Sequence, residues 1–92
     1  MIRSFKCRYT EKLAQGHYVK RFEDIERIAR RKLRQLDIAG RLEDLNVPPG
    51  NHLEALKGDR QGEYSIRLND QWRICFRWAS TDATDVEIVD YH

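Results

Sequence analysis

The chain lacks the features that define several large classes of protein. No run of about 18 apolar residues occurs, so we expect no membrane-spanning helix. The first residues, Met1 to Lys6, contain no apolar core of a secretory signal, and we expect a cytoplasmic protein. The 92 residues include only two cysteines. Cys7 and Cys75 are too few and too far apart for a zinc ribbon or a disulfide scaffold, so we expect free thiols.

Motifs of common enzyme classes are also missing. Neither a GxxxxGK(S/T) phosphate loop nor a GxGxxG fingerprint is present, and no serine lies in a nucleophile elbow. These absences argue against kinases, NTPases, dehydrogenases and serine hydrolases. His17 and His52 have no acid or cysteine partner at metal-ligand spacing, so we expect no metal site. We expect no cofactor.

Charge is distributed unevenly along the chain. Residues 1–41 carry twelve Lys/Arg and five Asp/Glu, or +7, whereas residues 42–92 carry five and ten, or −5, for a net +2. Much of the excess lies in a cluster that includes Arg30, Arg31 and Arg34. This cluster is either a solvated helix face or a footprint for an anionic partner such as nucleic acid or an acidic protein.

The N-terminal half is expected to be mostly helical. Length and composition fit one globular domain spanning residues 1–92, with 40% hydrophobic and 35% charged residues. We expect a short strand over Ile2 to Cys7 and a short helix over Glu11 to Gln15, N-capped by Thr10. Apolar residues at spacings of three and four predict a longer helix over Phe22 to Ala39, ended by a left-handed Gly40.

The C-terminal half is expected to form an antiparallel sheet. Leu53 to Leu56 predicts a short strand, and alternation of apolar and polar residues predicts strands over Tyr64 to Leu68, Trp72 to Trp78 and Thr84 to Asp90. Since helices precede strands, the class is α+β, with four to five twisted strands packed against two N-terminal helices.

Strand register places arginines opposite one another. A three-residue connection after Leu68 sets Arg67 opposite Arg73 on the face away from the core, and Glu63 opposite Arg77. Directly opposed like charges destabilise a strand pair, so the two arginines either splay into water or bind an anion. A five-residue connection over Ala79 to Ala83 would set Arg77 opposite Asp85 and Arg73 opposite Val89.

The side chains that remain suit one kind of chemistry. Lys57, Arg60, Arg67 and Arg73 are cationic, and Asp90, Tyr91 and His92 follow the last strand. An imidazole with cations and no metal fits cleavage of RNA, because the 2′-hydroxyl supplies the nucleophile.

Five segments resemble the HigB (plasmid maintenance killer) toxins of the RelE/ParE-like superfamily. They are Met1 to Phe5, Leu53 to Arg60, Tyr64 to Arg67, Gln71 to Phe76 and Val86 to His92. The ordered set LKGDR, WRIxF and a final DYH carries the likeness, which covers nearly the whole chain. The resemblance implies a RelE-like fold and a type II toxin that cleaves mRNA in the A site of the 70S ribosome. It also implies a HigA-type helix-turn-helix antitoxin. The toxin would contact DNA only indirectly, through this antitoxin.

The resemblance also implies residue roles. Catalytic roles fall on Lys57, Arg73, Asp90, Tyr91 and His92. We expect RNA contacts from Arg30, Arg31, Arg34, Arg60 and Arg67. Family members often have a histidine where this chain has Glu54; His52, on the same face of an expected strand, is an auxiliary candidate together with Glu54. The alternative function is a module that binds RNA, the ribosome or a protein and blocks translation without cutting.

Overall fold

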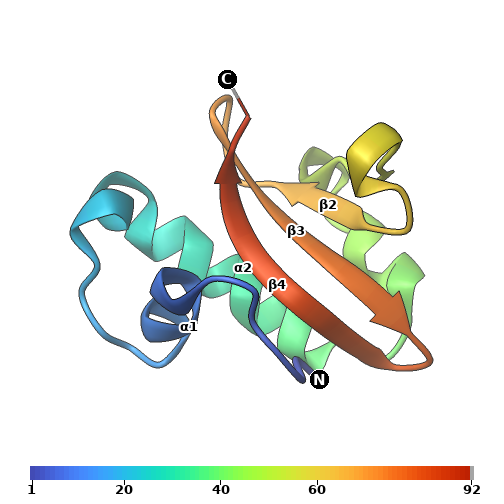
Figure 1. Ribbon diagram of the computed structural model, residues 1–92, viewed down its shortest axis with the longest axis horizontal. Helices are drawn as coiled ribbons and strands as arrows, with labels where there is room; N and C mark the ends of the chain where they lie inside the picture. Colours follow the sequence, from blue (N-terminus) through green and yellow to red (C-terminus); the bar gives the residue numbers. More distant parts are fainter. Residues whose placement is uncertain (92) are drawn as a thin grey trace.

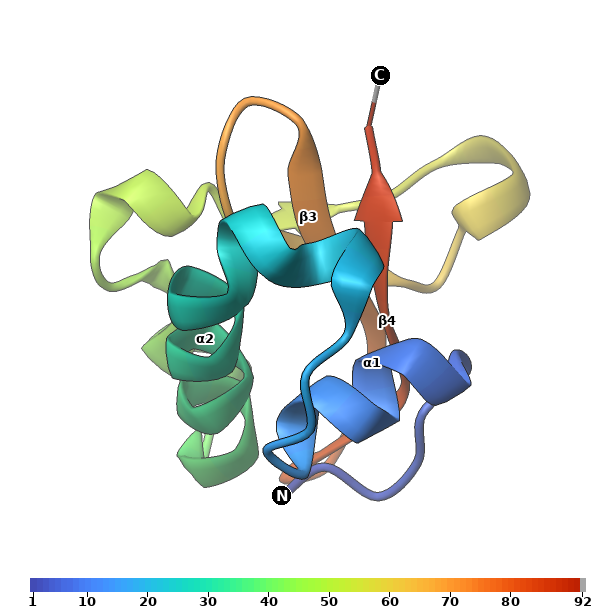
Figure 2. The same cartoon turned by 90° about the vertical axis from the view of Figure 1, so that its left-hand side faces the viewer.

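The computed structural model describes residues 1–91 as two α-helices and a four-stranded antiparallel sheet (Figure 1). The helices are α1 (Arg8–Ala14) and α2 (Glu26–Ile38), and the strands, in their spatial order, are β1 (Glu54–Ala55), β2 (Tyr64–Arg67), β3 (Trp72–Ala79) and β4 (Asp82–Asp90). Both helices lie on one side of the sheet (Figure 2). The predicted α+β class with two N-terminal helices is confirmed. Within residues 1–91, none of the helices has the length and apolar content of a membrane span.

The long helix starts later than its apolar pattern predicts. Phe22 and Ile25 belong to a 3₁₀ helix, η1 (Lys20–Ile25), which leads into α2 at Glu26. The predicted apolar stripe nevertheless faces the core, where Ala29, Leu33 and other residues of the stripe are buried against the sheet.

The end of α2 differs from the predicted glycine cap. Ala39 leaves the helix in an extended conformation, and Gly40 has no left-handed backbone. The Asp44 carboxylate instead accepts hydrogen bonds from the backbone N–H groups of Gly40 and Arg41, at 3.1 and 3.0 Å. A side chain from the following 3₁₀ helix, η2 (Leu42–Asn46), thus turns the chain.

The N-terminal segment also differs from its prediction. Ile2 and Phe5 form only isolated parallel bridges, with Ala83 and Val86, so the expected strand is wrong. Helix α1 begins at Arg8, and Thr10 lies inside it rather than capping it. The Thr10 hydroxyl accepts a hydrogen bond from the backbone N–H of Ile88 at 3.0 Å. It thereby satisfies a donor of the edge strand β4, which explains a buried threonine at this position.

The first predicted hairpin register is confirmed where it pairs residues of β2 and β3. Ile66 lies opposite Ile74 and Arg67 opposite Arg73. The pairing stops at Tyr64 and Phe76, so the predicted pairing of Glu63 with Arg77 does not form.

The second hairpin is tighter than predicted and contains a bulge. Ala79 pairs directly with Asp82, which places Arg77 opposite Thr84 rather than Asp85. A register shift follows between Cys75 and Arg77, where Asp85 adopts a left-handed φ of 52°. The extra residue of the bulge restores the predicted pairing of Arg73 with Val89.

Candidate active site

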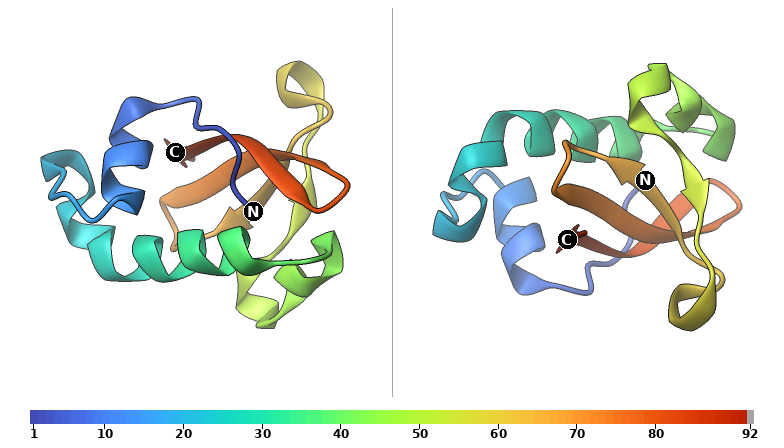
Figure 3. Two further views of the ribbon diagram at one scale, coloured as in Figure 1. Left: turned by 90° about the horizontal axis from the view of Figure 1, so that it is seen from below. Right: turned by 90° about the horizontal axis from the view of Figure 1, so that it is seen from above.

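The face of the sheet away from the helices carries several of the predicted site residues. Along β3, Ile74 and Phe76 enter the core. Arg73 and Cys75 alternate with them and therefore point to the other face. The short 3₁₀ helix η4 (Gly58–Arg60) lies on that side, opposite α2 (Figure 3). The two helices thus pack against one face of the sheet, and the η4 turn lies over the other, polar face.

Arg73 is the most enclosed cation of this face. It is 7% exposed. Its Nε donates to Ser65 Oγ at 2.8 Å, and its Nη2 donates to the backbone carbonyl of His52 at 2.8 Å. Nη2 also lies 3.8 Å from a carboxylate oxygen of Glu54. These contacts fix one edge of the guanidinium. Nη1 makes no hydrogen bond within residues 1–91. Since no buried side-chain polar atom there lacks a partner, Nη1 is not completely buried.

The like-charge pair predicted from register is present, and the structure compensates both charges. Arg67 turns toward the β2–β3 connection, where its Nε donates to the Asn69 carbonyl at 3.1 Å and its Nη2 pairs with Asp70. Arg73 turns the other way, toward Ser65 and the Glu54 carboxylate. The two guanidinium groups therefore have separate partners, so the predicted register carries no uncompensated charge.

The end of β4 brings Tyr91 and Asp90 to this region. The guanidinium carbon of Arg73 lies 5.2 Å from the centre of the Tyr91 ring. Gln71 holds the segment in place: its side-chain amide donates to Asp90 Oδ2 at 2.9 Å, and its carbonyl accepts from the backbone N–H of Tyr91 at 2.6 Å. His92, the predicted proton-transfer residue, lies outside the described residues.

Strand β1 places Glu54 beside the Arg73 cluster, which consists of Arg73, Asp90 and Tyr91. Glu54 pairs with Ser65, which in turn binds Arg73. Three residues further on, Lys57 is exposed and begins the η4 turn. His52 is not in a strand: it ends the 3₁₀ helix η3 (Pro49–Asn51) with a left-handed φ of 45°. The expectation that His52 shares a face with Glu54 through strand alternation is therefore wrong, and its contribution to the cluster is its backbone carbonyl.

The structure separates the predicted RNA-binding arginines. Arg60 is engaged by two carboxylates of the sheet, those of Glu63 and Glu87. Arg30 joins the two helices, since it donates to the carbonyls of Leu13 and His17 at 3.2 and 2.9 Å.

Arg31 and Arg34 are exposed on α2, the helix that lies across the sheet from η4 (Figure 3). Within residues 1–91 neither forms an ion pair. Both line a groove of about 840 Å³ between α2, the end of α1 and the N-terminal segment.

Two ionisable groups are perturbed by burial. Burial raises the pKa of the Cys75 thiol to about 11, and it lowers the pKa of Lys32 below its ordinary value. Cys75 is therefore a protonated thiol at neutral pH and a poor nucleophile. In the described part of the chain, no three His, Cys, Asp or Glu side chains gather as metal ligands.

Two residues that position the cluster were missed by sequence reasoning. Ser65 and Gln71 hold Arg73, Asp90 and the Tyr91 backbone in place. The only signal for Ser65 was its place on the polar face of a strand, two residues before Arg67. Gln71 lay in the expected loop and gave no signal.

Solved structures define the class of fold. The chain is similar to YafQ from Escherichia coli, with a TM-score of 0.67 at 17% identity, over 99% of this chain and 92% of the other. A YafQ mutant gives a TM-score of 0.70 at 16% identity over the same shares of the two chains. The chain therefore has the fold of YafQ.

Sequence comparisons define the family. Residues 3–92 match the model of the HigB-like toxins, described as RelE-like toxins of the type II toxin–antitoxin system HigB, and the chain belongs to this family. It is 39% identical over 80 residues to Toxin HigB-1 of Vibrio cholerae, covering 85% of this chain and 84% of the relative. It is 35% identical to Endoribonuclease HigB of Proteus vulgaris over the whole of both chains. A type II toxin implies an antitoxin partner.

Proposed function

We propose that the chain is an endoribonuclease that cleaves mRNA in the ribosomal A site and that a HigA-type helix-turn-helix antitoxin inhibits it. The observation that carries this proposal is the environment of Arg73, which is held on one edge by Ser65 and the His52 carbonyl while Nη1 has no hydrogen-bond partner within residues 1–91. A guanidinium fixed in this way suits binding of a phosphate. The full-length similarity to a relative named an endoribonuclease supports the same activity.

The proposed reaction is an intramolecular transesterification at the scissile phosphodiester. The 2′-oxygen attacks phosphorus, the bond to the 5′-oxygen breaks, and the products end in a 2′,3′-cyclic phosphate and a 5′-hydroxyl. One proton must leave the 2′-hydroxyl and one must reach the departing 5′-oxygen. The protein therefore supplies proton transfer and stabilisation of negative charge on the phosphorane.

We assign these tasks to the residues around Arg73. Arg73 and Lys57 stabilise charge on the phosphorane. His92, oriented by Asp90, transfers a proton. The Tyr91 ring, which contacts Arg73, stacks on a base or donates a proton. Glu54 lies near enough to Arg73 to assist proton transfer. The reaction as written needs no metal ion.

Ribosome binding is assigned to cations away from the cluster. Arg31 and Arg34 are exposed on α2 and suit contacts with the phosphates of ribosomal RNA. Arg67 lies next to the cluster and suits the mRNA strand. Such a toxin acts in the cytoplasm, and it meets DNA only when bound to its antitoxin.

The decisive experiment mixes the purified toxin with ribosomes carrying a defined mRNA in the A site. Primer extension should show cuts within the A-site codon, and EDTA at levels that leave the ribosomes intact should not abolish them. The variants Arg73→Ala and His92→Ala should lose cutting. Arg3→Ala, whose exposed side chain pairs with Asp82 at 3.1 Å at the start of β4, should not.

Three outcomes would contradict parts of the proposal. Arrest of translation without cleaved mRNA would mean that the chain blocks the ribosome instead. Efficient cleavage of naked RNA would remove the dependence on the ribosome. Unimpaired cleavage by His92→Ala would remove that residue from proton transfer.

A further inference from the structure

The turn between β1 and β2 has a defined backbone. The N–H of Leu56 donates to the Glu63 carbonyl at 2.8 Å and closes the turn at its base. Within it, the N–H of Arg60 donates to the Lys57 carbonyl at 3.3 Å. Gly58 and Gly62 have φ values of +65° and +94°, which other residues rarely adopt. The turn is therefore a compact unit that begins at Lys57.

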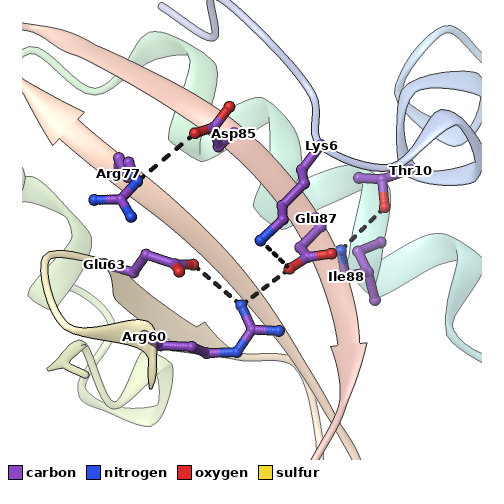
Figure 4. Close-up of polar contacts among 8 residues, drawn as sticks. All are labelled: Lys6, Thr10, Arg60, Glu63, Arg77, Asp85, Glu87 and Ile88. Carbon is purple, nitrogen blue, oxygen red and sulfur yellow. Dashed lines mark hydrogen bonds and ion pairs between the residues drawn. The ribbon is translucent and has the colours of Figure 1, made fainter. Parts of the chain in front are cut away.

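The Arg60 side chain connects this turn to the sheet. Its Nη1 donates to Glu63 Oε1 at 3.1 Å and to Glu87 Oε1 at 2.9 Å (Figure 4). Glu87 lies on β4, opposite Cys75 of β3, and the same carboxylate oxygen is 3.8 Å from Lys6 Nζ. One arginine thus joins the turn, the start of β2 and β4.

Burial makes this network more than a surface ion pair. The side chains of Glu63 and Glu87 are 5% and 15% exposed, and that of Arg60 is 36% exposed. Removal of Arg60 would leave two largely buried carboxylates with less compensation, which is costly. An RNA contact by Nη1 would compete with both carboxylates.

Lys57 has no comparable anchor of its own. Its side chain is exposed and forms no ion pair within residues 1–91. Its backbone lies between Leu56, whose N–H closes the base of the turn, and η4, where the Lys57 carbonyl accepts from the backbone N–H of Arg60. That turn meets the sheet through Arg60 and through Gly62, where an added Cβ would lie 2.9 Å from Arg77 Nη1.

We propose that Arg60 is a positioning residue: its ion pairs with Glu63 and Glu87 hold the β1–β2 turn against the sheet, so that Lys57 stays beside the phosphate bound by Arg73. The inference deepens the proposed function and rests on it for the role of Lys57. The attachment of the turn itself is independent of that function.

A double-mutant cycle tests the link between Arg60 and Lys57. Single-turnover cleavage of A-site mRNA is measured for Arg60→Ala, Lys57→Ala and the double variant, with ribosomes at saturation. Lys57→Ala should cleave roughly 100-fold more slowly, as on loss of one donor to the transition state. Arg60→Ala should lose no more than that, and the double variant should be no slower than Lys57→Ala. Arg60→Lys, which keeps one cation near the two carboxylates, should recover part of the rate. Arg3→Ala is the matched control, because it also breaks an ion pair to a β4 carboxylate.

A protease experiment tests the position of the turn without any assay of RNA cleavage. A lysine-specific protease should cut after Lys57 faster in Arg60→Ala than in the wild type or in Arg3→Ala, under conditions where all three remain folded by circular dichroism. Glu87→Gln should give an intermediate rate of cutting.

The two measurements separate failure of this inference from failure of the proposed function. Multiplicative losses in the double variant would mean that Arg60 acts independently of Lys57, and unchanged cutting after Lys57 would mean that Arg60 does not hold the turn; either result overturns the inference. Wild-type protein that cuts no mRNA would overturn the proposed function and with it the role of Lys57, while the protease result would still decide whether Arg60 holds the turn.

Discussion

The Arg73 guanidinium carbon lies 5.2 Å from the centre of the Tyr91 ring, so the last residue that the structure describes contacts the most enclosed cation of the sheet's polar face. The contact joins the middle of β3 to the segment that follows β4. It gives Tyr91 a defined neighbour although its side chain is exposed. A rigid cation and a solvent-facing aromatic ring at one place are what binding of a nucleotide requires, since the cation meets phosphate and the ring meets a base.

The first prediction concerns the planar shape of Arg73. The variant Arg73→Lys keeps the positive charge. Its single ammonium group cannot reproduce the planar guanidinium that donates to both Ser65 and the His52 carbonyl. We expect cleavage of A-site mRNA to fall about 100-fold, the scale of losing one oriented donor to a transition state. Single-turnover rates and the ribosome dissociation constant should be measured together. A loss of ribosome affinity with an unchanged rate would show that Arg73 only binds RNA.

The second prediction separates the ring of Tyr91 from its hydroxyl. The contact with Arg73 is made by the ring, so Tyr91→Phe should keep most of the cleavage rate. Tyr91→Ala should lose roughly 2- to 30-fold, the range that a cation–π contact of about 0.5 to 2 kcal/mol allows. Rates for both variants on the same ribosomes decide the matter. If Tyr91→Phe is as slow as Tyr91→Ala, the hydroxyl transfers a proton.

The third prediction concerns Arg30, which joins α1 to α2. Its guanidinium donates to the carbonyls of Leu13 and His17 and to Glu26, the last at 2.9 Å. Arg30→Ala should lower the free energy of unfolding by about 1–3 kcal/mol, because these are hydrogen bonds from a charged donor. Arg34→Ala, on the same helix and exposed, should change it by less than about 0.5 kcal/mol. Urea unfolding of the two variants gives the comparison, and equal losses would show that Arg30 is not the link between the helices.

The fourth prediction concerns the exposed arginines of α2. The pair of changes Arg31→Glu and Arg34→Glu should weaken ribosome binding most at low salt, because contacts with phosphates release counterions. The slope of log affinity against log salt should become shallower than in the wild type. Arg41→Glu is a control at an exposed arginine beyond the end of α2. An unchanged slope would assign the α2 arginines to solvent or to the antitoxin.

Sequence patterns predicted those parts of the fold that depend on period and parity. The alternation around Ile66 and Ile74 fixed both the core face and the Arg67–Arg73 pairing, since a slip by one residue would expose every apolar side chain. The pairing of Arg73 with Val89 was also right, although the prediction reached it through a longer turn. A five-residue loop pairs Arg73 with Val89, and so does a tight turn followed by a bulge at Asp85. The sequence could not distinguish these two arrangements.

Contacts between distant segments were not predictable in the same way. Thr10 was read as a helix cap because capping is a local property, whereas its hydroxyl accepts from Ile88, 78 residues away. The contact of Arg60 with Glu87, 27 residues further on, was likewise not predicted, because the charge of Arg60 was known and its partner was not. Long-range partners of this kind follow from the folded arrangement of strands and leave no periodic signal.

The last prediction uses the buried thiol of Cys75 to give stability a specific pH dependence. Cys75 is fully buried, and burial raises its pKa to about 11 from an ordinary value near 9. Between about pH 9 and 11 the thiol ionises in the unfolded chain but stays protonated in the folded protein, so the folded state binds more protons and stability falls as pH rises. The slope contributed by this one group is at most about 1.4 kcal/mol per pH unit.

Urea unfolding under reducing conditions at pH 8, 9 and 10 should therefore show a steeper loss of stability for the wild type than for Cys75→Ala, which has lower stability throughout because of the cavity but no thiol to titrate. Taking the difference between the two proteins cancels the tyrosines and lysines that also titrate in this range, and parallel slopes would mean that Cys75 ionises equally easily in the folded and unfolded chains.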